Sequence, residues 1–380
     1  MVFQPRFNYC DALVKHLGTI EAARAVIEVL PLPPDTALRL RHDAVQKSTR
    51  SSTQIEGNPL DEAEVRRAIA RSDRTGSDAE QEVRNYWRAL DRVEEFADAQ
   101  TPITEVFIKE LHRIVIVRSR GRRGSKSEYR VTECPVVDTV TRKIDYAPAT
   151  PEDVPVLMRE LVEWLSSTTT MQLPAPIRAA ILTHRFLSIH PFNDGNGRTG
   201  RLLATAELWR SGYRMRGFFS FDEYFNADRE RYYNNLQMGL PIDFYDGRHD
   251  PDHTPWILYF VETMANAPSE LQAKARSLYK AGTPEVPPWE RLPRTSQQLL
   301  TRLLARVLDG AENPFIINSS DIDSWFGVSE RTAREWLKQW TEEGFVNPIT
   351  TASGERVRNY ALAPEWVDTC FQMTTSSEIA

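Results

Sequence analysis

Residues 190–201 read His-Pro-Phe-Asn-Asp-Gly-Asn-Gly-Arg-Thr-Gly-Arg, and this stretch brings together the groups that phosphate chemistry requires. The imidazole of His190 can accept a proton, and the carboxylate of Asp194 can hold a divalent cation. Arg198 and Arg201 are three positions apart, so they share one face of a helix and can grip an anion together. The glycines before them let backbone N–H groups approach that anion closely.

Helical patterns lie on both sides of this stretch. Apolar residues recur at helical spacing over residues 176–189, and Pro191 then ends that pattern. Residues 202–209 are helical again, so the stretch is predicted to be a loop whose glycine-rich end meets a helix N-terminus. Exposed N–H groups and the helix dipole favour an anion there. The alternative is an ordinary surface turn, because asparagine, aspartate and glycine are also common in turns. His184 lies on the apolar face of the first helix and is predicted to be a core residue.

Length and composition limit the classes of protein that fit. A chain of 380 residues can bury a large core and is expected to hold roughly two or three domains. The net charge of -6 argues against general adhesion to nucleic acids or membrane surfaces. Three scattered cysteines form neither a disulfide framework nor a metal-ligand pattern, and neither a signal peptide nor an apolar run of ~20 residues is apparent. The sequence therefore predicts a soluble, cytoplasmic protein without a membrane partner.

The central stretch resembles, at every defining position, the H-x-F-x-[DE]-G-N-G-R-x-x-R signature of Fic-domain proteins. Those proteins carry the mainly helical Fido fold, and most of them transfer AMP from ATP to a hydroxyl group of a target protein. The resemblance implies that His190 is the general base and that Asp194 holds Mg²⁺. It also implies that the phosphates of ATP bind at neighbouring residues: Gly195, Asn196, Gly197, Arg198 and Arg201. Removal of AMP from a target is a second activity that the resemblance leaves open.

A second motif lies far upstream, at the end of a predicted helix over residues 36–56 that a glycine and a proline stop. Ser52 and Glu56 lie at i and i+4 on one face of this helix. From the residues alone they are an exposed polar helix end. However, residues 52–57, Ser-Thr-Gln-Ile-Glu-Gly, resemble the [ST]-x-x-x-E-[GN] inhibitory motif of Fic proteins. The resemblance implies that Glu56 pairs with Arg201 and holds ATP in a non-productive pose.

A short hairpin is predicted between the two motifs, where residues 129–140 and 142–146 are rich in β-formers. This segment is similar to the flap of Fic proteins, which aligns a target segment by adding to it as a strand.

A helix after the signature carries the pattern Tyr232, Tyr233 and Leu236, which resembles the adenine pocket of the family. Aromatic rings and an aliphatic side chain bind a flat base well. The alternative is a buried aromatic helix face. Leu240 stands where the family often has a polar residue.

A proline-rich run at residues 283–294 is the clearest predicted domain boundary. Before it we expect an N-terminal helical region over residues 1–100, which carries the inhibitory helix, and a catalytic domain with its flap over residues 101–282. Residues 295–380 resemble a winged helix-turn-helix domain, with residues 329–343 as the recognition helix.

Three cations lie on one face of that recognition helix and form a candidate DNA footprint: Arg331, Arg334 and Lys338. Nearby glutamates dilute the positive charge, so docking of a protein or of a second copy of the chain is the other use considered for this domain.

The overall expectation is a mainly α protein adenylyltransferase, inhibited by Glu56, that uses ATP and Mg²⁺. Its partner would be a Ser, Thr or Tyr hydroxyl of a target protein or of the enzyme itself, and homo-oligomers are left open. The alternative is a DNA-binding transcriptional regulator with a nucleotide-sensing core.

Overall fold

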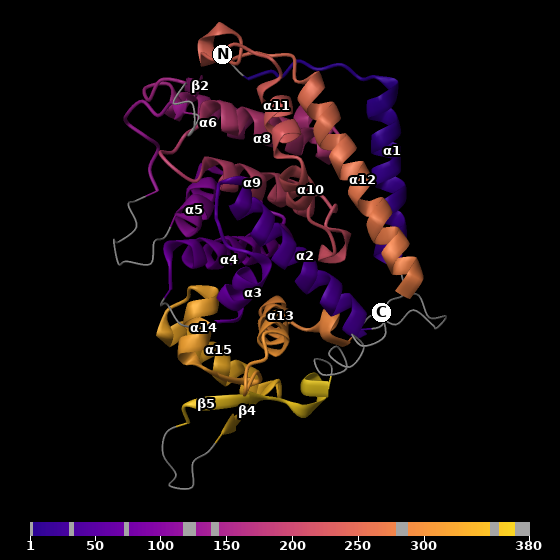
Figure 1. Cartoon of the computed structure of the whole chain (residues 1–380), viewed down its shortest axis with the longest axis vertical. Coiled ribbons are helices and arrows are strands. Elements are labelled where there is room, and N and C mark those ends of the chain that lie inside the picture. The colour runs from indigo at the N-terminus through magenta and orange to yellow at the C-terminus, as the bar shows by residue number, and fades with distance from the viewer. Residues whose placement is uncertain are drawn as a thin grey trace.

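The computed structural model describes residues 3–29, 34–71, 76–116, 127–137, 144–278, 288–349 and 357–368. These residues are mainly helical, with small antiparallel sheets, as the sequence predicts (Figure 1). No helix within the described ranges combines the length and the apolar character that a membrane crossing requires.

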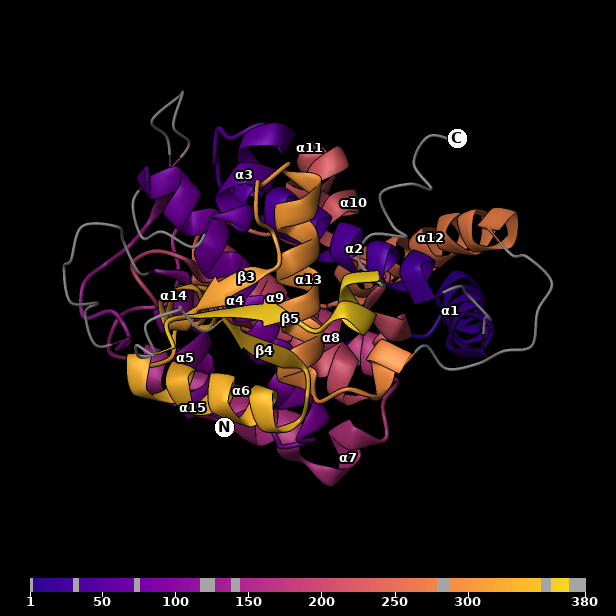
Figure 2. The same cartoon turned by 90° about the horizontal axis from the view of Figure 1, so that it is seen from below.

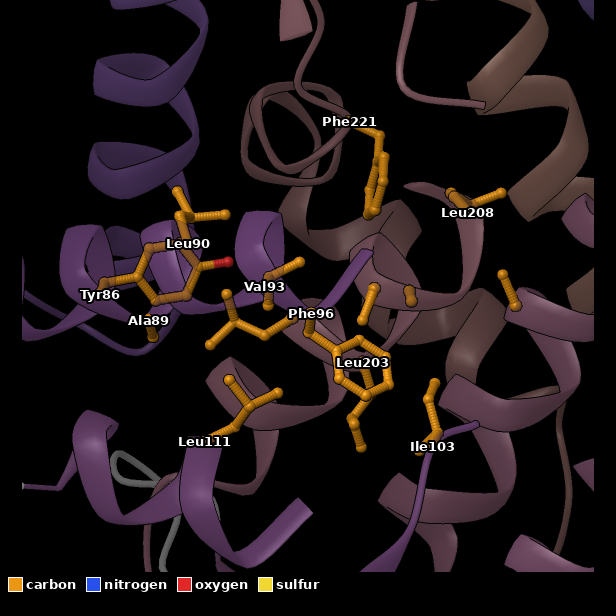
Figure 3. Packing of buried hydrophobic residues seen from close by; sticks show 14 of the residues in the cluster. Tyr86, Ala89, Leu90, Val93, Phe96, Ile103, Leu111, Leu203, Leu208 and Phe221 are labelled. Atoms are coloured by element: carbon orange, nitrogen blue, oxygen red, sulfur yellow. The ribbon is translucent and has the colours of Figure 1, made fainter. Parts of the chain in front are cut away.

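The centre of the molecule is built from two helices that flank the signature stretch, α8 (Ala175–Ile189) and α9 (Asn196–Arg210). All residues of α8 are buried, which fits a sequence that is apolar on nearly every side. Against α9 pack α4 (Asp78–Asp98) and α5 (Glu105–Val115). Figure 3 shows this core, in which Leu203 of α9 lies beside Phe96 of α4, while Leu208 of α9 lies on the side of Phe221.

The helix that carries the upstream motif is α2 (Pro34–Ile55), close to the predicted range of 36–56. It packs on α4 and on the short helix α10 (Asp222–Ala227), and Gly57 follows it with φ of 92°. A positive φ favours glycine because a Cβ atom would clash there, so this residue ends the helix as predicted. The next helices, α3 (Glu62–Ala70) and α4, each begin with a capping box, at Asp61 and Ser77.

The first helix is α1 (Asp11–Val29), and it begins nine residues before Ile20, where the apolar pattern of the sequence predicts a short helix over residues 20–29. It runs beside the long helix α12 (Thr254–Leu278), and the two are side by side in Figure 1. Leu13, Ile20 and Ile27 are buried at intervals of seven residues, so one narrow face holds α1 in place. That face is too sparse to show as a helical pattern in its first half.

Three further helices are α6 (Val154–Ser166), α7 (Thr168–Met171) and α11 (Arg229–Gln237). Helix α6 packs on α8, α7 packs on α6, and α11 packs on α10 and α12. The predicted hairpin is present as β1 (Val136–Val137) and β2 (Ile144–Tyr146), which pair antiparallel. Residues 138–143 of the predicted hairpin lie outside the described residues. Buried Tyr146 fixes β2 to the end of α8, because its hydroxyl donates a hydrogen bond to the carbonyl of Ser188.

The described C-terminal residues combine helices with a three-stranded antiparallel sheet of order β3-β5-β4 (Figure 2). The elements follow the order α13 (Arg294–Leu308), β3 (Ile316–Asn318), α14 (Ser319–Phe326), α15 (Glu330–Glu342), β4 (Val346–Ile349) and β5 (Asn359–Leu362). Helix α15 corresponds to the predicted recognition helix over residues 329–343. The winged-helix assignment stays a prediction, and so do the bounds of the predicted domains and of the linker.

This C-terminal part is packed directly on the N-terminal helices. Arg302 of α13 forms an ion pair with Asp91 of α4, and its guanidinium lies 4.7 Å from the ring centroid of Trp87. Arg41 of α2 donates to Gln297 of α13 at 2.8 Å. The helix that carries the upstream motif is therefore braced by α13 at one end while its other end reaches α9.

Candidate active site

Residues 190–201 form a tight loop that is closed by its own side chains. His190 ends α8 in the left-handed conformation (φ 53°, ψ 59°), and Phe192 is fully buried. The side chain of Asn196 accepts a hydrogen bond from the N–H of Phe192 at 3.0 Å and donates to its carbonyl at 2.7 Å. These two bonds hold the loop as a ring, so the amide of Asn196 shapes the loop, and any contact of this residue with a phosphate is left to its backbone N–H.

A buried arginine that the sequence analysis left out of the site holds the start of this loop. The side chain of Arg130 donates to the carbonyl of His190 at 2.8 Å, to that of Thr132 at 3.2 Å and to that of Ala149. Its backbone N–H also donates to the carbonyl of Pro191 at 2.9 Å. An arginine has five N–H donors in a fixed fork, so it can tie several segments together. The partners are carbonyl groups, which every residue carries, so no sequence signal distinguishes this role.

A buried histidine, also missed by the sequence analysis, holds the other side of the loop. The Nε2–H of His112 donates to the carbonyl of Asp194 at 2.9 Å, and its Nδ1 accepts from the hydroxyl of Ser127 at 2.5 Å. This tautomer follows from the carbonyl, which can only accept. Burial lowers the pKa of His112 to about 4, so the ring is neutral at pH 7. It also stacks on Phe192 with ring centroids 3.6 Å apart.

His190 itself lies at the rim of this arrangement, with a side chain that is only partly exposed. Burial and, to a smaller extent, the charge of Arg130 lower the pKa of His190 to about 4, although the carboxylates of Glu56 and Asp194 act in the opposite direction. The imidazole is therefore neutral near pH 7, and a neutral imidazole can accept a proton.

Next to His190, the N-terminus of α9 presents its first backbone N–H groups. Gly195 caps this helix with φ of 77°, and helix geometry leaves the N–H groups of the first turn without intrahelical acceptors. A Cβ atom on Gly197 would lie 2.0 Å from Oε1 of Glu56. The carboxylate of Glu56 therefore lies directly against the helix end, at the place where the loop is suited to an anion.

The predicted pair between the two motifs is present in the structure. Arg201 is 1% exposed, and its Nη2 donates to Oε1 of Glu56 at 3.0 Å and to the carbonyl of Ser52 at 2.8 Å. Its Nε donates to the hydroxyl of Ser52 at 2.7 Å and lies 3.5 Å from a carboxylate oxygen of Asp222. Burial lowers the pKa of Arg201, but the carboxylates of Glu56 and Asp222 outweigh it and keep the group charged.

The other signature arginine is also held by carboxylates. Arg198 forms an ion pair with Glu82 of α4 through Nη1, and its Nη2 donates to Oδ1 of Asp194 at 3.1 Å. The same oxygen of Asp194 accepts from the N–H of Gly195 at 2.6 Å. Glu82 was not part of the predicted site, because it lies more than a hundred positions before Arg198.

The proposed metal ligand can be tested against these surroundings. Within the described ranges, no three His, Cys, Asp or Glu side chains cluster as a ready metal site. The side chain of Asp194 is 58% exposed at the edge of the anion-binding turn. Mg²⁺ typically takes one or two carboxylates and completes its shell with phosphate oxygens and water, so a single exposed carboxylate fits it here.

The residues predicted to hold adenine are split between core and surface. Tyr232 is 1% exposed and packs against Phe225 with ring centroids 4.8 Å apart. Tyr233 is 39% exposed, and its hydroxyl donates to the carbonyl of Ile55 at 3.3 Å. Consecutive helical residues point about 100° apart, so the two rings cannot share one face. Tyr233 and the half-buried Leu236 therefore lie at the surface of α11, while Tyr232 lies in the core, and the adenine site stays a prediction.

The cations of the predicted DNA footprint are exposed, and each has a glutamate partner on the same helix. Arg331 pairs with Glu335 at 3.0 Å, Arg334 pairs with Glu330, and Lys338 lies 3.6 Å from Glu342. Such i,i+4 pairs are weak at an exposed helix surface, but they leave this face close to neutral.

Comparison with known proteins places the signature within a family. Residues 102–208 match the model of the Fic/DOC family. The chain is 29% identical over 202 residues to the protein adenylyltransferase Fic of Drosophila willistoni, a match that covers 52% of this chain and 39% of that protein. It is 40% identical over 68 residues to the protein adenylyltransferase fic-1 of Caenorhabditis elegans, covering 18% and 13%. The chain thus spans less than half the length of these curated relatives.

Solved structures share the fold at low sequence identity. A Fic family protein from Desulfovibrio desulfuricans is similar with a TM-score of 0.60 and 22% identity, over 95% of this chain and 99% of that one. A Fic domain containing signaling protein from Bacteroides thetaiotaomicron is similar with a TM-score of 0.56 and 22% identity, over 72% of this chain and 100% of the other.

Proposed function

Since residues 102–208 form a Fic/Doc family domain, we propose that this protein is an adenylyltransferase that moves AMP from ATP to a hydroxyl group of a target protein. The observation that carries the proposal is the neutral imidazole of His190 beside the free N–H groups of α9. Arg198 and Arg201 on the same helix turn give that site the charge that a triphosphate needs.

In the proposed reaction, the hydroxyl oxygen of a target Ser, Thr or Tyr attacks the α-phosphorus of ATP while His190 removes its proton. The new bond joins the hydroxyl oxygen to AMP, and the bond between the α- and β-phosphates breaks to release pyrophosphate. General base assistance of this kind contributes about 10²–10⁴ in rate. The backbone N–H groups around Gly195, Asn196 and Gly197 stabilise the charge that develops on the transferred phosphate.

Other residues bind and orient the nucleotide. Arg198 and Arg201 bind the β- and γ-phosphates once they are released from their carboxylates, and Asp194 holds Mg²⁺. When bound, the cation supplies charge neutralisation between phosphates. Tyr233 and Leu236 line the adenine side, with Tyr232 behind them.

The same contacts support autoinhibition by the upstream helix. Glu56 lies against the helix end where phosphates would bind, and Ser52 and Glu56 together accept hydrogen bonds from Nε and Nη2 of Arg201. An arginine that is already paired cannot orient a phosphate. In this proposal the described conformation is the inhibited one.

The DNA-binding alternative ranks second, because each cation of α15 already has a glutamate partner. The predicted roles of the flap, of self-modification and of AMP removal remain predictions that rest on the resemblance.

The proposal is tested with purified Glu56→Gly protein, in which the proposed inhibition is relieved, a cell lysate as the source of targets, and ATP radiolabelled at either the α- or the γ-phosphate. We expect protein bands that carry label from the α-phosphate and no label from the γ-phosphate. Label from the γ-phosphate alone would identify a kinase, and the absence of both would overturn the assignment. If the protein transfers no label but shifts DNA in a gel, the result would support the alternative, a DNA-binding transcriptional regulator.

The pH dependence of transfer follows from the lowered pKa of His190. With a pKa of about 4 the base is unprotonated over the neutral range, so kcat/KM should stay flat from pH 8 down to about pH 6 and fall as the pH approaches about 4. A drop centred near pH 6.5 would show instead an unperturbed imidazole. Folding must be followed in parallel by circular dichroism. A histidine whose pKa is lowered by folding binds fewer protons in the folded state, so stability is itself lost as the pH falls from about 6.5 towards 4.

Replacement of Arg130 tests how precisely His190 must be held. Arg130→Met removes the donors to the carbonyls of His190, Thr132 and Ala149. We expect the transfer rate to fall by about 10- to 100-fold, because small displacements of a reacting group have effects of this size. The affinity for ATP, measured by calorimetry, should change little, because Arg130 contacts the loop backbone on the side of His190. Arg130→Lys should recover part of the rate, and a loss of ATP affinity equal to the loss of rate would contradict this role.

A further inference from the structure

The inhibitory glutamate has a structural counterpart on the neighbouring helix. Glu82 of α4 pairs with Arg198 as Glu56 pairs with Arg201, so each signature arginine is held by a carboxylate that lies outside the signature. Arg198 is buried, with a side chain only 8% exposed, whereas that of Glu82 is 22% exposed. The ion pair therefore lies at the wall of the site, where a nucleotide could reach it.

The two carboxylates are connected through one turn of the chain. Asn58, two residues after Glu56, donates from its side chain to Oε2 of Glu82 at 2.7 Å and to the carbonyl of Ala79 at 3.0 Å. Asn58 is itself buried, at 8% exposure. The turn that follows α2 therefore contacts Arg201 directly and Arg198 through Glu82.

The cavity beside this turn is lined mainly by negative charges, which disfavour the entry of phosphates. It measures about 390 Å³, and its wall includes four carboxylates, those of Glu56, Asp78, Glu82 and Asp194. Arg198 is the one cation among the described residues of this wall. A triphosphate is strongly anionic, so it is repelled here as long as the carboxylates keep Arg198 neutralised.

Arg198 has two carboxylate partners, and their positions suggest which of them must give way. A bidentate contact with phosphate uses the terminal nitrogens of a guanidinium, and here Nη1 faces Glu82 while Nη2 faces Asp194. Asp194 belongs to the signature and is exposed enough to turn towards Mg²⁺. The proposed reaction gives Glu82 no cation to bind in place of Arg198.

We propose that Glu82 is a second inhibitory residue, which lowers the affinity for the β- and γ-phosphates of ATP by holding Arg198. This inference rests on the proposed function of the site and deepens it. Glu82 acts through Arg198, so it is a positioning residue. Productive binding of ATP then requires release of both arginines, and the turn at residues 56–58 is the element that can release them together.

The test is the affinity of Glu82→Gln for Mg·ATP and for AMP, measured by calorimetry on the full chain. Glutamine keeps the shape and an acceptor but removes the charge. We expect ATP to bind about tenfold more tightly, in line with the loss of one charged hydrogen bond that competes for Arg198. AMP lacks the phosphates that Arg198 would grip, so its affinity should stay unchanged, which a merely structural effect of the substitution would not produce.

Two further variants make the result decisive. Glu95→Gln removes one negative charge from the same helix at a surface position paired with Arg92, and it should leave both affinities unchanged. Glu82→Asp shortens the side chain so that it no longer reaches Arg198. We expect this variant to bind ATP more tightly than wild type, which keeps the proposal testable even if Glu82→Gln folds poorly. Unchanged or weaker ATP binding in both Glu82 variants would overturn the proposal. Tighter ATP binding by Glu82→Gln, together with no transfer of label from the α-phosphate even when Glu56→Gly is added to that variant, would leave this inference standing and contradict the adenylyltransferase assignment instead.

Discussion

Replacing His190 by alanine should abolish most transfer of AMP while leaving ATP bound. We expect the rate of labelling from the α-phosphate to fall by about 10²–10⁴-fold, the usual contribution of a positioned general base. The groups proposed to bind the triphosphate, Arg198 and Arg201, are fixed by α9 and by their own ion pairs, independently of the imidazole. The affinity for Mg·ATP should therefore stay within about threefold of wild type.

A matched substitution separates this effect from a general one. His249 is exposed and lies outside the signature, so His249→Ala should transfer AMP at the wild-type rate. The loop itself should persist in His190→Ala, because Asn196, Arg130 and His112 hold it through backbone groups. Labelling by His190→Ala at the wild-type rate would show that another group removes the proton, and the proposed mechanism would then be wrong.

The parts of the fold that the sequence predicts well are those that depend on local rules. Helices α8 and α9 follow from apolar spacing, and the break between them follows from Pro191 and Gly195. The end of α2 follows from Gly57 and Pro59, since one adopts a positive φ and the other cannot continue a helix. Such features are written in neighbouring residues, so they can be read without knowledge of the tertiary structure.

The groups that hold the site were not predictable in the same way. Arg130 donates to the backbone carbonyl of His190, 60 positions further along the chain, and His112 donates to that of Asp194, 82 positions further along. Any residue can supply a carbonyl group, so the partner leaves no mark in the sequence. Glu82 is similar, because an isolated glutamate on an amphipathic helix is usually exposed to solvent. The contact between Glu56 and Arg201 was anticipated only through resemblance to a family, since from the residues alone Glu56 is a polar helix end.

The aromatic residues of α11 illustrate a third situation, in which the pattern fits two structures equally. Tyr232 and Tyr233 were open to two interpretations, an adenine pocket and a buried helix face. The structure divides them between the two, since Tyr232 is in the core and Tyr233 is at the surface. The direction of each side chain depends on how α11 lies against its neighbours, and periodicity alone does not fix that.

Helix α2 connects the C-terminal part of the chain with the candidate active site. One end of the helix, at Arg41, is braced by Gln297 of α13 and by Glu94 of α4. The other end places Glu56 against Gly197 and Arg201. Because a helix is stiff along its axis, a displacement of α13 would move α2 and so change the position of Glu56 in the proposed nucleotide site. The turn at residues 56–58 is then the point where such a displacement would act on both arginines.

Removing the carboxylate of Glu56, which we propose to be inhibitory, should have the opposite effect to removing the proposed base, His190. In Glu56→Gly the space over Gly197 opens and Arg201 loses its partner at 3.0 Å, so the γ-phosphate can take the vacated place. A hydrogen bond to a charged group contributes about 1.5–3 kcal/mol, and each ~1.4 kcal/mol corresponds to a factor of ten. We therefore expect self-labelling from the α-phosphate to rise by about ten- to a hundredfold, with tighter binding of ATP.

The size of this gain depends on whether Glu56 acts by charge or by bulk, and two variants distinguish these. Glu56→Gln keeps the bulk and removes the charge, so a gain close to that of glycine indicates that competition for Arg201 dominates, because a neutral amide binds a guanidinium weakly. Glu62→Gly, at an exposed glutamate that pairs with Arg50, controls for loss of a surface charge and should transfer at the wild-type rate. Equal or lower labelling by Glu56→Gly would mean that the contact with Arg201 orients the arginine for catalysis.

Since Asp222 lies 3.5 Å from Nε of the same arginine and remains in the variant, Arg201 should stay in place when Glu56 is gone. A rise in activity would then reflect access of the phosphates to a site that is already formed.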